Sequence, residues 1–199
     1  EALKSYGPDL KGISKISVQT GTTHGGVPLA DGSVAKVKLD FETLEKLSEV
    51  SRSRYGLSGA VQHGASTLPN EAFDRFPAIG TAEIHLATGF QNIIYDSAHF
   101  PVDLKDRIYE YLQREMAGEK KEKDTEEQFI YKTRKKGFGP FKQELWQLPP
   151  ETLKQISTEL ENQFTFLFRK LNVANTEAVV RKFVSAVEVP LKAPAALKG

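Results

Sequence analysis

Three short apolar segments in the first half of the chain have the character of buried β-strands. They cover residues 13–20, 58–62 and 81–87, where β-branched and small residues are frequent. A stretch with helical spacing separates the first two segments, and a short helix over residues 69–73, followed by Gly80, separates the second from the third. This strand–helix–strand order predicts parallel β/α units with right-handed crossovers.

The remaining apolar positions recur at the spacing of amphipathic helices. Asp40 can cap the helix between the first two strands. Its apolar positions are Phe41, Leu44, Leu47 and Val50. From residue 102 the chain is predominantly helical, first with a stripe of Leu104, Ile108, Leu112 and Met116. A long helix is predicted after Pro149 and Pro150, with the stripe Leu153, Ile156, Leu160, Phe164, Leu167 and Leu171. A shorter helix is predicted over residues 176–187, and residues 118–127 are expected to form a solvated, mobile connection.

The strand count leaves two alternatives for the fold. A sheet of three parallel strands leaves apolar faces and strand edges exposed unless other elements cover them. A complete (β/α)8 barrel takes about 250 residues. The pattern therefore fits either a small open sheet or the last strands of a barrel.

The chain starts with glutamate, and residues 1–6 resemble the end of a helix before Gly7 and Pro8. We expect from this that it begins inside a larger fold, with simple removal of a few N-terminal residues as the alternative.

Composition excludes several classes of function. The chain has no cysteine, so disulfides and thiolate metal sites are excluded. The net charge of +1 gives no electrostatic case for nucleic acid, although residues 132–142 interleave basic and aromatic side chains as some single-strand binders do. No apolar run approaches the roughly 20 residues of a membrane span, and no signal-peptide pattern opens the chain. We expect a cytoplasmic protein with no nucleic-acid or membrane partner.

Histidines stand at corresponding positions of the three predicted strands. His24 follows the first strand and precedes Gly25, and His63 ends the second strand before Gly64. His85 lies within the third strand. In parallel α/β folds the C-terminal ends of the strands carry the active site. Imidazole binds divalent metals, and glycine lets backbone N–H groups approach a phosphate closely.

Two imidazoles at these strand ends can share one ion. Neighbouring strands lie about 4.8 Å apart, and Zn–N bonds are about 2.0–2.1 Å long. A catalytic zinc usually has three protein ligands, so we expect a third ligand from elsewhere. A single His–Gly pair is more often a structural loop feature, but two pairs on successive strands favour a metal site at His24 and His63.

The segments around these histidines resemble the class II, zinc-dependent fructose-bisphosphate aldolases. Residues 21–27 (GTTHGGV), 63–66 (HGAS) and 84–88 (IHLAT) resemble the family's motifs on barrel strands 6, 7 and 8. Weaker similarity in the tail extends the resemblance to about residues 13–172. It implies that His24 and His63 bind zinc. It also implies a substrate phosphate site formed by Gly25, Gly64, Ser66 and Thr88.

The chain also departs from the family pattern. The family's strand-8 motif is Asn-x-Asp-Thr, but this chain has His85 and Ala87 and keeps Thr88. The arginine of the family's last long helix corresponds to Gln163. The family's first five strands, which supply a catalytic base and a further metal ligand, have no counterpart here. We take His85 as the catalytic candidate, either as a substrate contact or as a third metal ligand. The structural alternative is that the His85 side chain faces the helices and has no role in the site.

The resemblance implies an α/β fold that is the C-terminal portion of a TIM (β/α)8 barrel, with about three strands followed by a helical tail. Residues 1–100 would form the last β/α units, residues 101–192 a helical extension packing on the barrel, and residues 193–199 a flexible tail.

The implied activity is cleavage of a ketose 1,6-bisphosphate, with fructose 1,6-bisphosphate the favoured substrate, to dihydroxyacetone phosphate and glyceraldehyde 3-phosphate. The cofactor would be Zn²⁺ or another divalent metal. The partners would be the N-terminal half of the barrel and further copies in a homo-oligomer. Two alternatives remain: a non-catalytic relative that binds a sugar phosphate, and another zinc-dependent sugar-phosphate enzyme on the same barrel.

Overall fold

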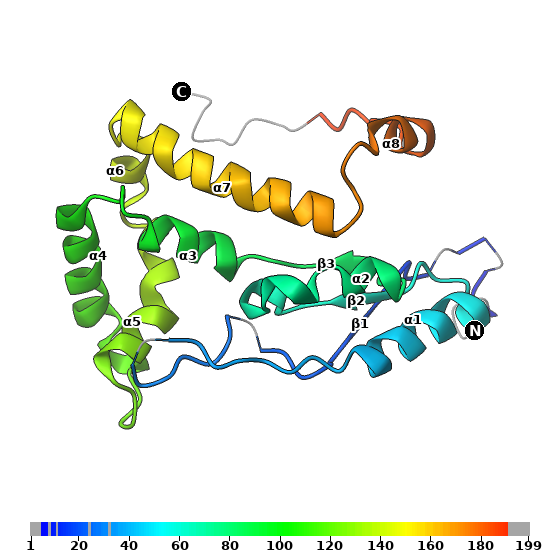
Figure 1. The fold of residues 1–199 in the computed structure, drawn as a ribbon, viewed down its shortest axis with the longest axis horizontal. Coiled ribbons are helices and arrows are strands. Elements are labelled where there is room, and N and C mark those ends of the chain that lie inside the picture. The colour runs from blue at the N-terminus through cyan, green and yellow to red at the C-terminus, as the bar shows by residue number, and fades with distance from the viewer. Residues whose placement is uncertain (1–4, 8, 11, 24, 32, 191–199) are drawn as a thin grey trace.

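The computed structural model describes residues 5–7, 9–10, 12–23, 25–31 and 33–190. They form an α/β structure with a small parallel sheet and many helices (Figure 1). His24 and the predicted flexible tail lie outside the described residues. Within the described residues, no helix combines the length and apolar character that crossing a membrane requires.

The sheet consists of three parallel strands in the order β1-β2-β3. They are β1 (Ile16–Val18), β2 (Ala60–Gln62) and β3 (Glu83–Ile84). Val61 of the central strand pairs with Ser17 on one side and Glu83 on the other. The parallel arrangement that the sequence predicts is confirmed. Closure into a barrel stays a prediction.

All three strands are shorter than predicted because the central strand is short. Gly59 and Gly64 flank β2 with φ of +133° and +69°, so the backbone turns at both of its ends. Regular pairing is therefore restricted to a few residues, although on the β1 side the Ser58 N–H still donates to the Ser14 carbonyl at 2.8 Å. On the β3 side, two bonds of 2.9 Å extend the ladder beyond the assigned strands, from Ala82 N–H to the Ala60 carbonyl and from His85 N–H to the Gln62 carbonyl.

Helix α1 (Phe41–Tyr55) begins where the sequence predicts. The Asp40 carboxylate accepts a bond of 3.0 Å from the Thr43 backbone N–H, which caps the helix. The helix ends at Gly56, whose φ of +65° is left-handed.

The predicted inner face of α1 is wrong in its second half. Phe41 and Leu44 are buried, but Leu47 and Val50 are 40% and 43% exposed. Ser48 and Ser51 are buried instead. The Ser48 hydroxyl accepts a bond of 3.0 Å from the Ala60 backbone N–H, and its small side chain lets the helix lie close to β2. Because α1 and β2 pack closely at this point, the buried position is occupied by serine and not by one of the larger apolar residues beside it.

A first core fills the space between α1, the sheet and the segments that follow β2. Those segments are the 3₁₀ turns η2 (Ala65–Thr67) and η3 (Asn70–Ala72) and the short helix α2 (Arg75–Ala78). The buried members are Leu39, Phe41, Leu44, Ala60, Ala65, Leu68, Ala72, Phe73, Phe76 and Leu167. Because this core covers the face of the sheet that carries Ala60 and Ile84, strand alternation places Ser17 and Glu83 on the opposite face.

A second core lies among the helices that follow β3. They are α3 (Thr88–Asp96), α4 (Val102–Glu115), α5 (Glu126–Thr133), the 3₁₀ turn η5 (Arg134–Phe138) and α6 (Lys142–Trp146). Its buried members are Tyr95, Phe100, Leu104, Ile108, Leu112 and Ile156. Three of the four residues of the predicted α4 stripe are thus confirmed as core, and Met116 packs against them while partly exposed.

Helix α7 (Pro150–Lys170) joins the two cores. Ile156 packs into the second core and Leu167 into the first, and the helix runs along α3 (Figure 1). The predicted stripe is only partly buried, since Leu153 is 38% and Phe164 is 42% exposed. The last helix, α8 (Glu177–Phe183), has no buried residue. The boundary predicted between barrel units and helical extension at residue 100 stays a prediction.

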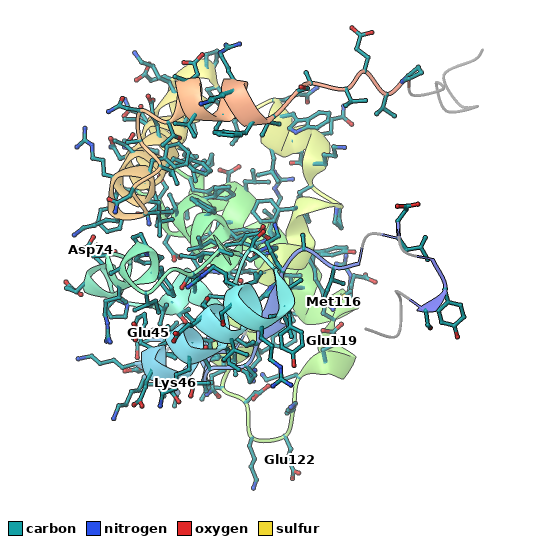
Figure 2. All side chains as sticks on the ribbon, turned by 90° about the vertical axis from the view of Figure 1, so that its right-hand side faces the viewer. Glu45, Lys46, Asp74, Met116, Glu119 and Glu122 are labelled. Atoms are coloured by element: carbon teal, nitrogen blue, oxygen red, sulfur yellow. The ribbon has the colours of Figure 1, made fainter. Side chains whose placement is uncertain are left out.

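The charged connection between α4 and α5 is exposed, as expected. After the 3₁₀ turn η4 (Ala117–Glu119), the chain forms a loop whose tip, at Glu122, projects from the body of the molecule (Figure 2). Ion pairs tie the loop on both sides of this tip. They are Lys120–Glu126, Lys132–Asp124 and Lys136–Glu119.

Candidate functional site

A cavity of about 270 Å³ opens at the C-terminal ends of β2 and β3. It is lined by Gly25, His63, Gly64, Ser66, His85, Leu86, Ala87 and Thr88. Six of the seven predicted site residues therefore lie around one cavity, although they come from three separate segments. The seventh, His24, lies outside the described residues. The roles predicted for these residues stay predictions.

A buried glutamine joins the first two of these segments. Gln62 is fully buried at the end of β2. Its Oε1 accepts a bond of 2.6 Å from the Thr20 hydroxyl, and its Nε2 donates a bond of 2.9 Å to Thr22. The Thr22 hydroxyl in turn donates to the His63 carbonyl at 2.7 Å. This network fixes the loop that leaves β1 against the backbone of His63.

Gly64 is required at its position by the closeness of that loop. Its φ is +69°, and a Cβ there would lie 2.9 Å from the Thr22 hydroxyl and 3.0 Å from the Thr23 carbonyl oxygen. Any side chain would push the two loops apart. The sequence pattern predicted a glycine with a backbone role, and this contact supplies the steric reason.

Ser66 connects the η2 turn to the start of α3. Its hydroxyl oxygen accepts a bond of 3.1 Å from the Ala87 backbone N–H. Because the oxygen is the acceptor, the hydroxyl proton can be donated to a ligand. Ala87 is the N-cap of α3 and Thr88 its first residue, so the positive end of the helix dipole lies at the cavity.

His63 and His85 lie side by side, with ring centroids 4.2 Å apart and planes at 39°. Sequence reasoning missed the partner that orients His85. His85 Nε2 bonds one carboxylate oxygen of Glu83, and the other oxygen pairs with Lys15 from the neighbourhood of β1. These side chains share the face of the sheet opposite the first core. Period-two spacing of Glu83 and His85 was the available signal.

The charge of Glu83 follows from these two partners. The hydrogen bond from Lys15 first, and that with His85 second, hold the pKa of Glu83 below its usual value. The group is therefore a carboxylate at neutral pH, as a partner of an imidazole N–H must be.

The imidazole nitrogens of this region have the chemistry of a divalent-metal site, but the described residues do not complete one. Among them, no three His, Asp or Glu side chains converge as metal ligands do. His63 is the described residue that fits the predicted ligand set. Since a catalytic zinc usually has three protein ligands, further ligands are needed.

A second cavity of about 240 Å³ adjoins the first, and both are lined by Gly25 and Thr88. Lys132, Arg134 and Lys135 give it a positive lining. Arg134 is buried, and it forms bonds of 2.5 and 3.0 Å to the Asp96 carboxylate. Burial opposes the charge of Arg134, but Asp96 holds its pKa above the usual value. Within the basic and aromatic segment 132–142, Arg134 is therefore a buried, paired residue, whereas other basic residues of the segment lie at the surface.

Comparison with known proteins identifies one family. A family model described as fructose-bisphosphate aldolase class-II matches residues 9–166. The match includes all seven predicted site residues and most of α7. No curated protein matches the chain.

Proposed function

Because the chain belongs to the class II fructose-bisphosphate aldolase family, we propose that it carries part of the site for metal-dependent cleavage of a ketose 1,6-bisphosphate. Fructose 1,6-bisphosphate is the proposed substrate, and dihydroxyacetone phosphate and glyceraldehyde 3-phosphate are the products. The observation that carries this proposal is the single cavity around Gly25, His63, Gly64, Ser66, His85 and Thr88.

One side of the cavity suits a phosphate group. Gly25 and Gly64 both have positive φ, a conformation in which backbone N–H groups can face an anion. The hydroxyls of Ser66 and Thr88 and the first turn of α3 add donors and a positive dipole end. The basic lining of the adjoining cavity also favours an anionic ligand. We assign the substrate phosphate to this side.

The other side of the cavity suits the reacting end of the substrate. His63, with His24 from outside the described residues, would hold Zn²⁺ or another divalent ion. Such an ion supplies Lewis-acid polarisation of a substrate carbonyl. His85 stands beside His63 and is oriented by Glu83. We assign it a hydrogen bond to a substrate oxygen, the role of the asparagine that the family has at this position.

The remaining groups of the site must come from elsewhere. A third metal ligand and a catalytic base are needed, and the described residues offer no such cluster around His63. We propose that they lie on further strands of a barrel, which would also pair with the strand edges at β1 and β3, and that the complete protein is a homo-oligomer.

An aldol-cleavage assay on the complete protein tests this proposal. We expect cleavage of fructose 1,6-bisphosphate that is lost on treatment with a chelator and restored by added Zn²⁺. Cleavage that persists at full rate after the metal has been removed would contradict the assignment.

A non-catalytic sugar-phosphate-binding protein is the second candidate. Ala87 favours it, because an apolar residue lines the cavity where the family has an aspartate. That protein would bind fructose 1,6-bisphosphate in calorimetry but would show no cleavage with metal present.

A further inference from the structure

Helix α5 holds the glycine-containing loop that follows β1. Three of its side chains, spaced three residues apart on one face, donate hydrogen bonds to backbone carbonyls of that loop. The bonds run from Tyr131 to Gly25 at 2.8 Å, from Gln128 to Pro28 at 2.8 Å and from Thr125 to Ala30 at 3.3 Å. The helix and the loop therefore run alongside each other over one full face of α5.

The helix itself is fixed in place. Its N-terminus has a capping box, in which Thr125 and Gln128 bond each other's backbone N–H. Phe129 and Thr133 are buried on its inner side. The same Gln128 side chain thus serves the cap through its Oε1 and the loop through its Nε2.

Tyr131 is the member of this set that reaches the site. Its hydroxyl donates to Gly25 and accepts a bond of 3.1 Å from Asn92 on α3. Asn92 accepts from Arg134 at 2.7 Å, and Arg134 pairs with Asp96, also on α3. One polar network therefore joins Gly25 to the helix whose first residue is Thr88.

This network determines the backbone conformation at Gly25. A glycine has no side chain to restrict its rotation, so contacts of its peptide groups set its φ and ψ. The peptide between Gly25 and Gly26 is held at both ends, because Tyr131 binds its carbonyl and its N–H donates to the Thr23 carbonyl at 3.1 Å. The φ of Gly25 is +80°, and a Cβ there would lie 3.5 Å from the Thr88 hydroxyl.

We propose that Tyr131 is a positioning residue for substrate phosphate binding. It holds Gly25 in the left-handed conformation and keeps it at a fixed distance from the Thr88 end of α3. Tyr131 does not line the first cavity, although it lines the adjoining one, and it acts through the backbone of Gly25. The inference rests on the proposed phosphate site at Gly25 and Thr88.

The variant Tyr131→Phe in the complete protein tests this role. It removes one hydroxyl and leaves the Gly25 carbonyl and the Asn92 amide without their shared partner. We expect the dissociation constant and the KM for fructose 1,6-bisphosphate to rise about 3- to 30-fold, the range for losing one hydrogen bond and leaving its partners unsatisfied. We expect kcat to change by less than about twofold and the metal content to stay the same.

Two further variants make the result specific. Tyr111→Phe is the matched control, because the Tyr111 ring packs edge-on against Phe141 in the second core, away from the site, and we expect it to leave the dissociation constant unchanged. Ser66→Ala tests the phosphate site itself. Weaker binding in Ser66→Ala with unaltered binding in Tyr131→Phe would overturn the role of Tyr131 alone. Unaltered binding in both would overturn that role together with the proposed phosphate site.

Discussion

His85 is the residue whose role the local chemistry restricts most. Its Nε2 is bonded to Glu83, so Nδ1 is the ring nitrogen that can face a substrate oxygen or a metal ion. Lys15 binds the other Glu83 oxygen, which fixes the carboxylate from two sides. A histidine held in this way keeps one orientation, as a residue that contacts a reacting group must.

The variant His85→Asn separates the two roles open to this residue. If His85 contacts the substrate, asparagine keeps a hydrogen bond, and we expect unchanged zinc content with kcat/KM lowered about tenfold. If His85 is a metal ligand, zinc and activity fall together, because an amide binds zinc poorly. Metal analysis alongside the cleavage assay decides between them, and we expect the first result. Wild-type turnover with full zinc would make His85 a structural residue.

Several residues of the site could be predicted from the sequence, and others could not. The His–Gly pairs were visible because two of them recur at the ends of successive predicted strands. Gln62 was not, because an amide within a strand is indistinguishable in sequence from a solvated one, and only its long-range bonds to Thr20 and Thr22 show that it is buried. The Lys15–Glu83 pair joins residues 68 apart, which no local pattern predicts.

At the scale of elements, the sequence predicted where strands and helices lie along the chain. It predicted their end residues and their buried faces only in part. The cap at Asp40 was confirmed because capping is a local interaction. The inner face of α1 was not predicted correctly. Ser48 lies on that face because β2 approaches the helix closely, and the local sequence does not show this approach. The lengths of the strands likewise depend on the glycines around β2 and on pairing between distant segments.

Substitutions on α1 test this account of its packing. Ser48→Leu should lower the free energy of unfolding by about 1–3 kcal/mol, because a larger side chain must fit against β2 and the bond to Ala60 is lost. Leu47→Ser, one residue earlier and 40% exposed, should cost less than about 1 kcal/mol. Chemical denaturation of both variants measures the difference. A larger loss in Leu47→Ser would show that the sequence-based face was the correct one.

At the scale of the whole molecule, the candidate site depends on both the sheet and the later helices. The cavity lies at the ends of the strands, but α5 fixes the loop at Gly25 and α7 connects the two cores. The helices after β3 are therefore part of the framework of the site. This could not be read from the sequence, in which residues 118–127 mix both charge signs and predict only a solvated connection.

The most direct test of the central claim is the metal content and cleavage activity of His63→Ala in the complete protein. If His63 is a ligand of a catalytic metal, two or fewer remaining ligands cannot hold the ion against water. We predict that stoichiometric zinc and cleavage of fructose 1,6-bisphosphate are lost together, while the Tyr111→Phe protein keeps both. Full zinc content in His63→Ala, or cleavage that continues at the wild-type rate, would contradict the assignment of this cavity as an aldolase site.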